Sequence, residues 1–252
     1  MIEQCKTILS DGSRCDGYQG HIGRCRKKGQ SLVVLSFIIF FLAIILVVQS
    51  QAQVLYVSND TDKVLLVIPR LTQIAYSENS FYSYYGNECD ESCLVQPLNK
   101  TDSNQNVSGL YGFEKLNENF DVMNDTEIDK NPGIINDYHH IILLHEEYAT
   151  QKIFDAITNH TNVIYLYPNS FYALVSVDYT NNTMSLVQGH GYKNMINGFD
   201  WKYDNTALEI IPCVKEHWKF YDSPVGRLLD CSPEIILKID PTLRRELQDN
   251  FN

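Results

Sequence analysis

The hydrophobic pattern of the chain is dominated by one apolar run, Leu32 to Val48, in which Ser36 is the single polar residue. A helix of about 20 apolar residues crosses a bilayer, and it satisfies all of its backbone groups internally. The run therefore predicts one transmembrane helix. The chain would then consist of a head (1–30), this helix (31–50), a linker (51–62) and a large domain (63–252).

Within the large domain, the clearest pattern is a strand–helix–strand unit. The apolar runs 141–144 and 163–167 predict strands, and segment 150–160 places its apolar residues on one helical face, with Thr150 at the N-cap position. A unit of this kind is right-handed almost without exception. The continuous apolar run Val64–Ile68 predicts a further strand, buried on both faces as in a parallel sheet.

The other segments predict smaller elements. They are an aromatic loop at 71–86, an exposed polar insertion at 87–108, a helix at 110–116, a short strand at 120–123, a hairpin of 171–178 and 184–188 that turns at Asn181-Asn182, an irregular aromatic region from Gly189 onward, and a helix at 241–249.

Charge is distributed unevenly about the apolar run. Residues 1–30 carry six Lys/Arg and three Asp/Glu, and the rest of the chain carries 14 and 28. By the positive-inside rule, the predicted topology is a single pass through the cell membrane, with the N-terminus cytoplasmic and the large domain extracytoplasmic. An acidic external domain argues against a nucleic-acid partner. The alternative is a cleaved signal peptide, since Ser50-Gln51-Ala52 resembles a processing site.

Glycosylation and cysteine patterns agree with an external domain. Asn-x-Ser/Thr sequons stand only after the apolar run, and an Asn-rich composition is the alternative explanation. The sequons are at Asn59, Asn99, Asn106, Asn124, Asn159 and Asn181. Four cysteines of this part predict disulfides, most simply Cys89 with Cys93 and Cys213 with Cys231. A redox or metal pair at Cys89 and Cys93 is the alternative.

The head contains a candidate zinc site. Cys5, Cys15, His21 and Cys25 supply three thiolates and one imidazole, which is a complete tetrahedral shell for zinc. The Gly20-His21-Ile22-Gly23-Arg24-Cys25 segment resembles small Cys/His zinc knuckles. The alternative is a cytosolic tail with free thiols.

Two stretches of the large domain resemble a known enzyme. Val67-Ile-Pro-Arg-Leu-Thr-Gln-Ile-Ala-Tyr76, followed by Ser80-Phe81-Tyr82, is the first; Leu143-Leu-His-Glu-Glu-Tyr148, followed by Asn169-Ser-Phe-Tyr172, is the second. In the same order they resemble the C-terminal domain of the large subunit of N,N-dimethylformamidase. The resemblance implies an α/β domain built as a flavodoxin-like, class I glutamine amidotransferase-like sandwich, preceded by the transmembrane helix and the small Cys-rich head.

The resemblance also implies candidate site residues. The turn that holds the nucleophilic cysteine of amidotransferases corresponds to Tyr167-Pro168-Asn169-Ser170, which has no cysteine. Dimethylformamidase holds iron by two tyrosines and a glutamate, which implies Tyr76, Glu147 and a second tyrosine, Tyr82 or else Tyr84 or Tyr85. Such hard oxygen ligands suit a ferric ion that acts as a Lewis acid. The alternative is that Tyr76 packs against the sheet and Glu147 caps a helix.

Two histidines extend this set of candidates. His145 and His190 each follow a predicted strand, where α/β sheets place their ligand sites. We therefore count His145 with Glu147 and Tyr76 as candidate catalytic residues. A histidine that only satisfies loop carbonyls is the alternative at both positions.

The sequence favours a membrane-anchored, glycosylated surface binding or interaction module without hydrolytic chemistry, because the nucleophile is missing. Its partner would be an unknown surface molecule. The alternative is an iron-dependent hydrolase of C–N bonds in small amides. A third hypothesis is a structural envelope protein that docks through its head.

Overall fold

The computed structural model describes residues 63–100, 109–118, 120–194, 196–215 and 217–249, all within one unit of the chain, Thr61–Asn252. The predicted zinc residues Cys5, Cys15, His21 and Cys25, the predicted transmembrane segment 31–50, and the sequons at Asn59 and Asn106 lie outside these residues.

The large sheet has six strands in the order β3-β1-β4-β6-β10-β9. The first five are parallel, and β9 is antiparallel to β10. The strands are β1 (Val64–Ile68), β3 (Asp121–Asn124), β4 (His140–Leu143), β6 (Val163–Tyr165), β9 (Phe220–Ser223) and β10 (Gly226–Leu229). The chain direction across the sheet reverses between β1 and β4, so their carboxyl ends border a topological switch point, where open α/β sheets bind ligands.

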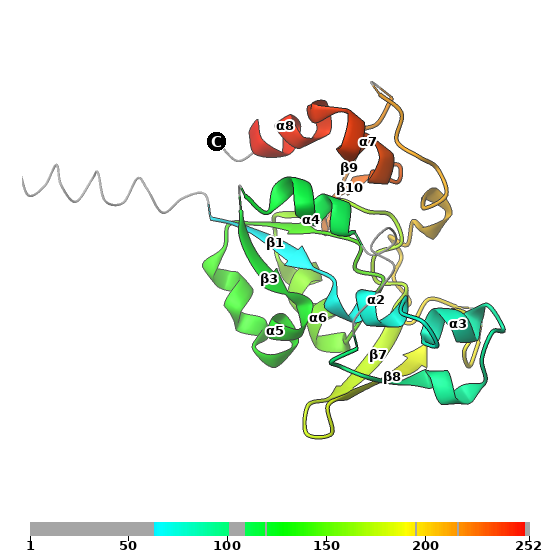
Figure 1. The fold of residues 1–252 in the computed structure, drawn as a ribbon. Helices are drawn as coiled ribbons and strands as arrows, with labels where there is room; N and C mark the ends of the chain where they lie inside the picture. Colours follow the sequence, from blue (N-terminus) through cyan, green and yellow to red (C-terminus); the bar gives the residue numbers. More distant parts are fainter. Residues whose placement is uncertain (1–62, 101–108, 119, 195, 216, 250–252) are drawn as a thin grey trace, which may run out of the picture. The chain divides into compact units, whose positions relative to one another are not determined.

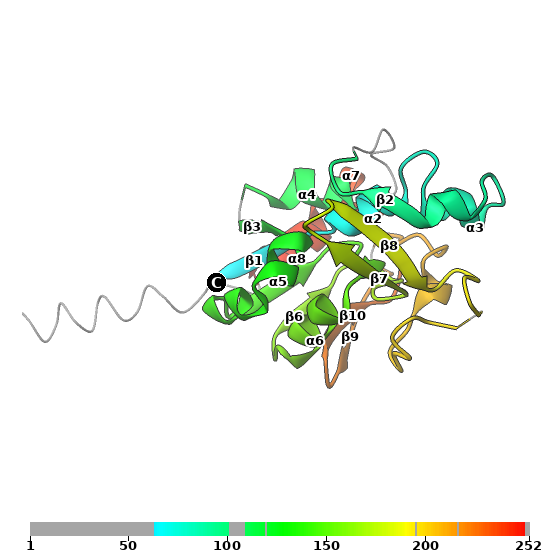
Figure 2. The same ribbon diagram turned by 90° about the horizontal axis from the view of Figure 1, so that it is seen from below.

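A second sheet has four strands in the order β2-β8-β7-β5. Figure 2 shows β7 and β8 as a long hairpin, with β2 along the edge of β8. The strands are β2 (Val95–Pro97), β5 (Tyr148–Ala149), β7 (Ala173–Asp178) and β8 (Thr183–Gln188). Because β5 follows β4 after a few residues, the chain passes at this point directly from the large sheet into the second sheet.

The two faces of the large sheet are buried in separate cores. In Figure 1, α4, α7 and α8 lie on one side of β1, and α2, α5 and α6 lie on the other. Leu65 and Val67 of β1 belong to the core that includes α2, α3, α5, α6 and the second sheet, whereas Leu66 belongs to the core of α4, α7 and α8. The helices are α2 (Arg70–Ala75), α3 (Phe81–Tyr85), α4 (Leu110–Leu116), α5 (Asp125–Lys130), α6 (Gln151–Asn159), α7 (Glu234–Ile239) and α8 (Pro241–Asp249). Three short 3-10 helices are η1 (Glu91–Leu94), η2 (Pro132–Asp137) and η3 (Thr206–Leu208).

The structure corrects the predicted fold class. Instead of one sandwich about a single sheet, the domain is a mixed α/β fold with two sheets. A preceding transmembrane helix was part of the prediction, and among the described residues no helix is long and apolar enough to cross a membrane. The second sheet was missed because β2 and β5 have only three and two residues, too few to show a period.

Several individual elements are confirmed. The strand Val64–Ile68, the helix Leu110–Leu116, the β4–α6–β6 unit and the β7–β8 hairpin form as the pattern predicts. Thr150 caps α6, since its hydroxyl accepts a hydrogen bond from Ile153 N at 3.3 Å. The predicted aromatic loop is wrong, because it contains α2 and α3. The hairpin β9–β10 lies in the region predicted to be irregular.

Both predicted disulfides are present. Cys89 pairs with Cys93, and Cys213 pairs with Cys231. Such bonds persist in oxidising compartments and are rare in the cytosol, so they are typical of an extracytoplasmic domain.

Candidate functional site

The candidate site lies where the chain passes from β4 to β5, at the carboxyl end of the large sheet. His145, Glu146 and Glu147 occupy this connection, and all three are buried. The Glu147 carbonyl accepts hydrogen bonds from Tyr172 N and Ala173 N, at 3.0 and 2.9 Å. Backbone pairing thus holds a segment of three ionisable residues in the interior.

Glu147 is the centre of the site, and its side chain is fully buried. Its Oε2 accepts a hydrogen bond from the Tyr76 hydroxyl at 2.5 Å, and its Oε1 contacts His190 Nε2. Burial alone would raise the pKa of Glu147. The hydrogen bond and charge of His190, together with the charge of His145 and the Tyr76 hydroxyl, outweigh burial and lower that pKa. Glu147 is therefore a buried, ionised carboxylate.

Tyr76 is a hydrogen-bond donor in this arrangement. Burial, followed by the charge of Glu147, raises the pKa of the Tyr76 hydroxyl well above 10.0. The phenol therefore keeps its proton at neutral pH. Its ring stacks on that of Tyr82, with the ring centroids 4.5 Å apart.

His190 reaches Glu147 from the tip of a tight turn. The turn runs from Gly189 to Tyr192 and is closed by a hydrogen bond from Tyr192 N to Gly189 O at 2.9 Å. His190 and Gly191 have φ of 49° and 78°, as the two central residues of a type I′ turn do. A positive φ is unfavourable for most residues other than glycine, although histidine is enriched there. The turn directs the His190 ring at the Glu147 carboxylate.

A second carboxylate faces the same histidine from a distant loop. His145 Nε2 lies 3.7 Å from Glu147 Oε2 and 3.4 Å from Glu209 Oε1. One ligand atom from each of these three residues lies within 4.8 Å of the other two. One imidazole and two carboxylates are a donor set that fits a metal ion.

Asn169 holds the loop that carries Glu209. Its side-chain amide donates to Glu209 Oε2 at 3.1 Å, and its Oδ1 accepts a hydrogen bond from Thr206 Oγ1 at 2.7 Å. Its backbone N–H donates to Asn205 Oδ1 at 3.0 Å. Asn169 is buried and has a φ of 66°.

Aromatic side chains surround His190. Its ring centroid lies 5.0 Å from that of Tyr85 and 4.7 Å from that of Tyr172. Tyr148 stacks on it at 5.4 Å. Tyr85 is 47% exposed, and Tyr82 of the same helix is 42% exposed. These two tyrosines of α3 therefore form the solvent-facing side of the site.

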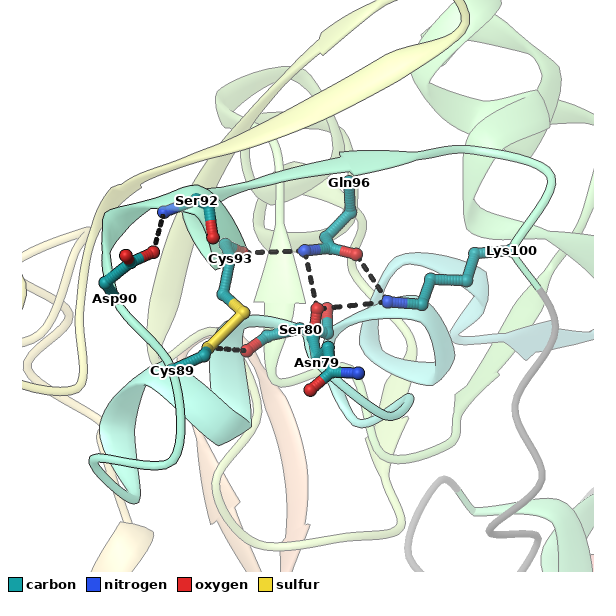
Figure 3. The surroundings of a disulfide bond; sticks show 8 residues. All are labelled: Asn79, Ser80, Cys89, Asp90, Ser92, Cys93, Gln96 and Lys100. Carbon is teal, nitrogen blue, oxygen red and sulfur yellow. Dashed lines mark hydrogen bonds between the residues drawn. A yellow bond between two sulfur atoms is a disulfide. The ribbon is translucent and has the colours of Figure 1, made fainter.

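The Cys89–Cys93 loop supports α3 (Figure 3). Buried Gln96 donates two hydrogen bonds through Nε2, to the Cys93 carbonyl at 2.8 Å and to the Asn79 carbonyl at 3.0 Å. Lys100 Nζ donates to Gln96 Oε1 at 2.6 Å and to the same Asn79 carbonyl at 3.1 Å. The chain on both sides of α3 is therefore tied together.

A buried carboxyl pair lies behind the site. Burial raises the pKa of Asp125 to about 7, although its carboxylate accepts hydrogen bonds from Leu71 N and Thr126 N. Burial and the charge of Asp125 raise the pKa of Glu146 well above its usual range. Burial is the largest cause of both shifts, and the charge of Asp125 adds to it at Glu146, so Glu146 keeps its proton at neutral pH.

The predicted site residues come together in part. Tyr76, Tyr82 and Glu147 are neighbours, and His145 joins them. Tyr84 instead packs edge-on against Tyr192 with the centroids 6.0 Å apart. Sequence reasoning missed Glu209 and Asn169 as partners, because no motif surrounds Glu209 and only the tertiary fold brings it to His145.

No family model and no curated protein matches this chain. The function is therefore inferred from the geometry of the site.

Proposed function

We propose that the domain is a metal-dependent hydrolase that cleaves the C–N bond of a small amide. One observation carries the proposal: Glu147 is kept ionised in the interior by Tyr76, His145 and His190, at the edge of the sheet where α/β domains bind ligands. Burying a charge is costly unless it is paired, so a fully buried carboxylate with a phenol and two imidazoles around it marks a candidate functional site.

The chain offers no cysteine at the turn Tyr167–Ser170, so water is the natural nucleophile. Glu147 would hold the metal ion, together with donors that surround it. When bound, such an ion polarises the amide carbonyl and lowers the pKa of water beside it. The resemblance to dimethylformamidase agrees with this reaction class.

The residues of the chain supply positioning and proton transfer. Tyr76 orients the Glu147 carboxylate through its hydrogen bond, and His190 is placed to hold a proton beside Glu147 Oε1. Water gives up one proton in the attack and the departing amine takes up one, so a group that accepts the first proton and then returns it serves both halves. Tyr82 and Tyr85 flank the side from which a substrate would enter.

The test is hydrolysis of small amides by the purified full chain loaded with Fe³⁺ or Zn²⁺, followed as released amine. Glu147→Gln preserves the shape of the side chain, and we expect it to lower kcat/KM by at least about 100-fold. Glu78→Gln is the matched control, since Glu78 is exposed. Metal-loaded protein that cleaves no amide faster than buffer would contradict the proposal.

A non-catalytic surface module is the second candidate function. It is favoured by the half-exposed tyrosines of α3 and by the exposed sequon residues Asn99, Asn159 and Asn181. A ligand that binds the native protein and Glu147→Gln equally, with no turnover by either, would support this candidate over the hydrolase.

A further inference from the structure

His145, Glu147 and Glu209 form a ligand set that differs from the tyrosine-based set implied by family resemblance. We propose that these three residues bind one divalent first-row ion, with Asn169 as the residue that positions Glu209. The inference specifies the metal centre on which the proposed function depends, but metal binding by the three residues can be measured without any turnover.

The separations fit one shared ion. Zinc lies about 2.0 to 2.2 Å from nitrogen and oxygen ligands, so neighbouring ligands of a tetrahedral ion are about 3.3 to 3.6 Å apart. His145 Nε2 lies 3.4 Å from Glu209 Oε1 and 3.7 Å from Glu147 Oε2. All three ligand atoms lie within 4.8 Å of one another, close to the spacing that one shared ion requires.

The three side chains differ in burial, as expected of a metal site that a substrate can reach from solvent. Glu147 is 0% exposed and His145 is 5% exposed, whereas Glu209 is 33% exposed. Two ligands thus stand in the interior and the third closes the solvent side. Three protein ligands leave a coordination position open, as catalytic metal sites require.

Both carboxylates are held by outer partners. Glu147 accepts the Tyr76 hydroxyl and contacts His190, and Glu209 accepts the Asn169 amide. Ligating carboxylates are usually oriented in this way, and loss of such a partner costs about 10 to 100-fold in metal affinity. Tyr76 donates its proton to a ligand here, so its place in the arrangement is that of an outer partner.

The donor types select the class of ion. Imidazole suits Zn²⁺ and Fe²⁺, and carboxylates accept both, whereas an all-oxygen set would favour Mg²⁺ or Ca²⁺. Binding brings a cation between the Glu147 and Glu209 carboxylates, so relief of the repulsion between these two charges becomes part of the affinity.

The experiment is equilibrium dialysis of the full chain with Zn²⁺ alone. Cys5→Ser, Cys15→Ser and Cys25→Ser are included throughout, so that the thiols of the head do not contribute. We expect one equivalent of Zn²⁺. Glu209→Gln should lower affinity by at least about 100-fold, and Asn169→Gly by about 10-fold, because glycine keeps the positive φ and removes the amide. Glu78→Gln and Asn136→Ala, at exposed positions, should leave the affinity unchanged.

The outcomes separate this inference from the proposed function. Zn²⁺ affinity that survives Glu209→Gln but falls in Tyr76→Phe would overturn it, as would a visible phenolate band on loading with Fe³⁺. No Zn²⁺ bound by the native side chains would also overturn it. Zn²⁺ bound with the expected losses but without amide cleavage would support the inference and remove the hydrolase. Melting curves of each variant confirm that it is folded.

Discussion

At the scale of single residues, Glu147 shows how a buried charge is maintained. Desolvation opposes its ionisation, and three neighbours from three different segments reverse that effect. Tyr76 ends α2, His145 precedes Glu147 in the chain, and His190 comes from the turn after β8. The ionised state of Glu147 is therefore a property of the fold.

The contact between His190 and Glu147 makes the first prediction. His190→Asn keeps a residue that tolerates positive φ, and it removes the imidazole that lowers the Glu147 pKa. We expect the acid limb of the kcat/KM profile to move to higher pH and activity at pH 7 to fall on the order of 100-fold. His139→Asn is the control, because His139 is exposed and lies before β4.

The same variant has a predictable effect on stability. A carboxyl whose pKa is lower in the folded than in the unfolded state stabilises the fold above the unfolded value, and that stability is lost as the pH falls through the folded value. His190→Asn should therefore lower the melting temperature at pH 7, and the loss should shrink below pH 4.5, the ordinary Glu value. An unchanged acid limb would contradict the role of the contact.

Among the secondary-structure elements, some could be predicted from the local sequence pattern, whereas others depend on tertiary contacts. The strand Val64–Ile68 and the β4–α6–β6 unit were predictable, because their periodicity and the Thr150 cap are written in consecutive residues. Helix α2 was not, since six residues with no side-chain cap bond make a marginal helix alone. It is held from outside by Asp125, which accepts a hydrogen bond from Leu71 N at 2.8 Å.

The candidate site likewise contains residues that the sequence predicts and residues that depend on tertiary contacts. Tyr76 and Glu147 were predicted as site residues from short sequence stretches, and in the structure they are in contact. Glu209 was not, because its role depends on Asn169, which lies 40 positions away in the sequence. The Gly189-His190-Gly191 segment carries a usable signal for a turn with positive φ, but the direction of its histidine depends on the second sheet.

The second prediction concerns the Asp125–Glu146 pair, which lies where α2, α5 and the β4–β5 connection meet. Both pKa values are raised, so the folded state binds more protons than the unfolded state between about pH 4 and pH 7. Stability from this pair is therefore present at low pH and decreases as the pH rises through about 7.

Glu146→Gln replaces the titrating carboxyl with a neutral amide and keeps a donor for Asp125. We expect its melting temperature at pH 8 to exceed that of the native chain by roughly 4 °C, and the two to be equal near pH 4. Thermal melts across this range measure the difference. A gain that is the same at pH 4 and pH 8 would contradict a raised pKa of Glu146 in the folded state.

On the scale of the whole molecule, the two disulfides among the described residues have different roles. Cys89–Cys93 spans four positions and stiffens the chain beside α3, whereas Cys213–Cys231 spans 18 and ties the end of β10 to the loop that follows Glu209. A parallel pairing of Pro212 with Ser232 continues this connection. The longer bridge therefore joins the large sheet to the segment that presents Glu209.

The third prediction compares the two bridges by double Cys→Ser replacement. A closed loop of this length contributes about 3 kcal/mol in the chain-entropy account, so loss of Cys213–Cys231 should lower the melting temperature by roughly 6 to 12 °C. It should also weaken Zn²⁺ binding, because Glu209 would sample more positions. The Cys89–Cys93 bond closes a far smaller loop. Its loss should therefore change substrate KM more than stability, since α3 carries Tyr82 and Tyr85. Equal melting temperatures and Zn²⁺ affinities in the two variants would show that the Glu209 loop is positioned by Asn169 alone.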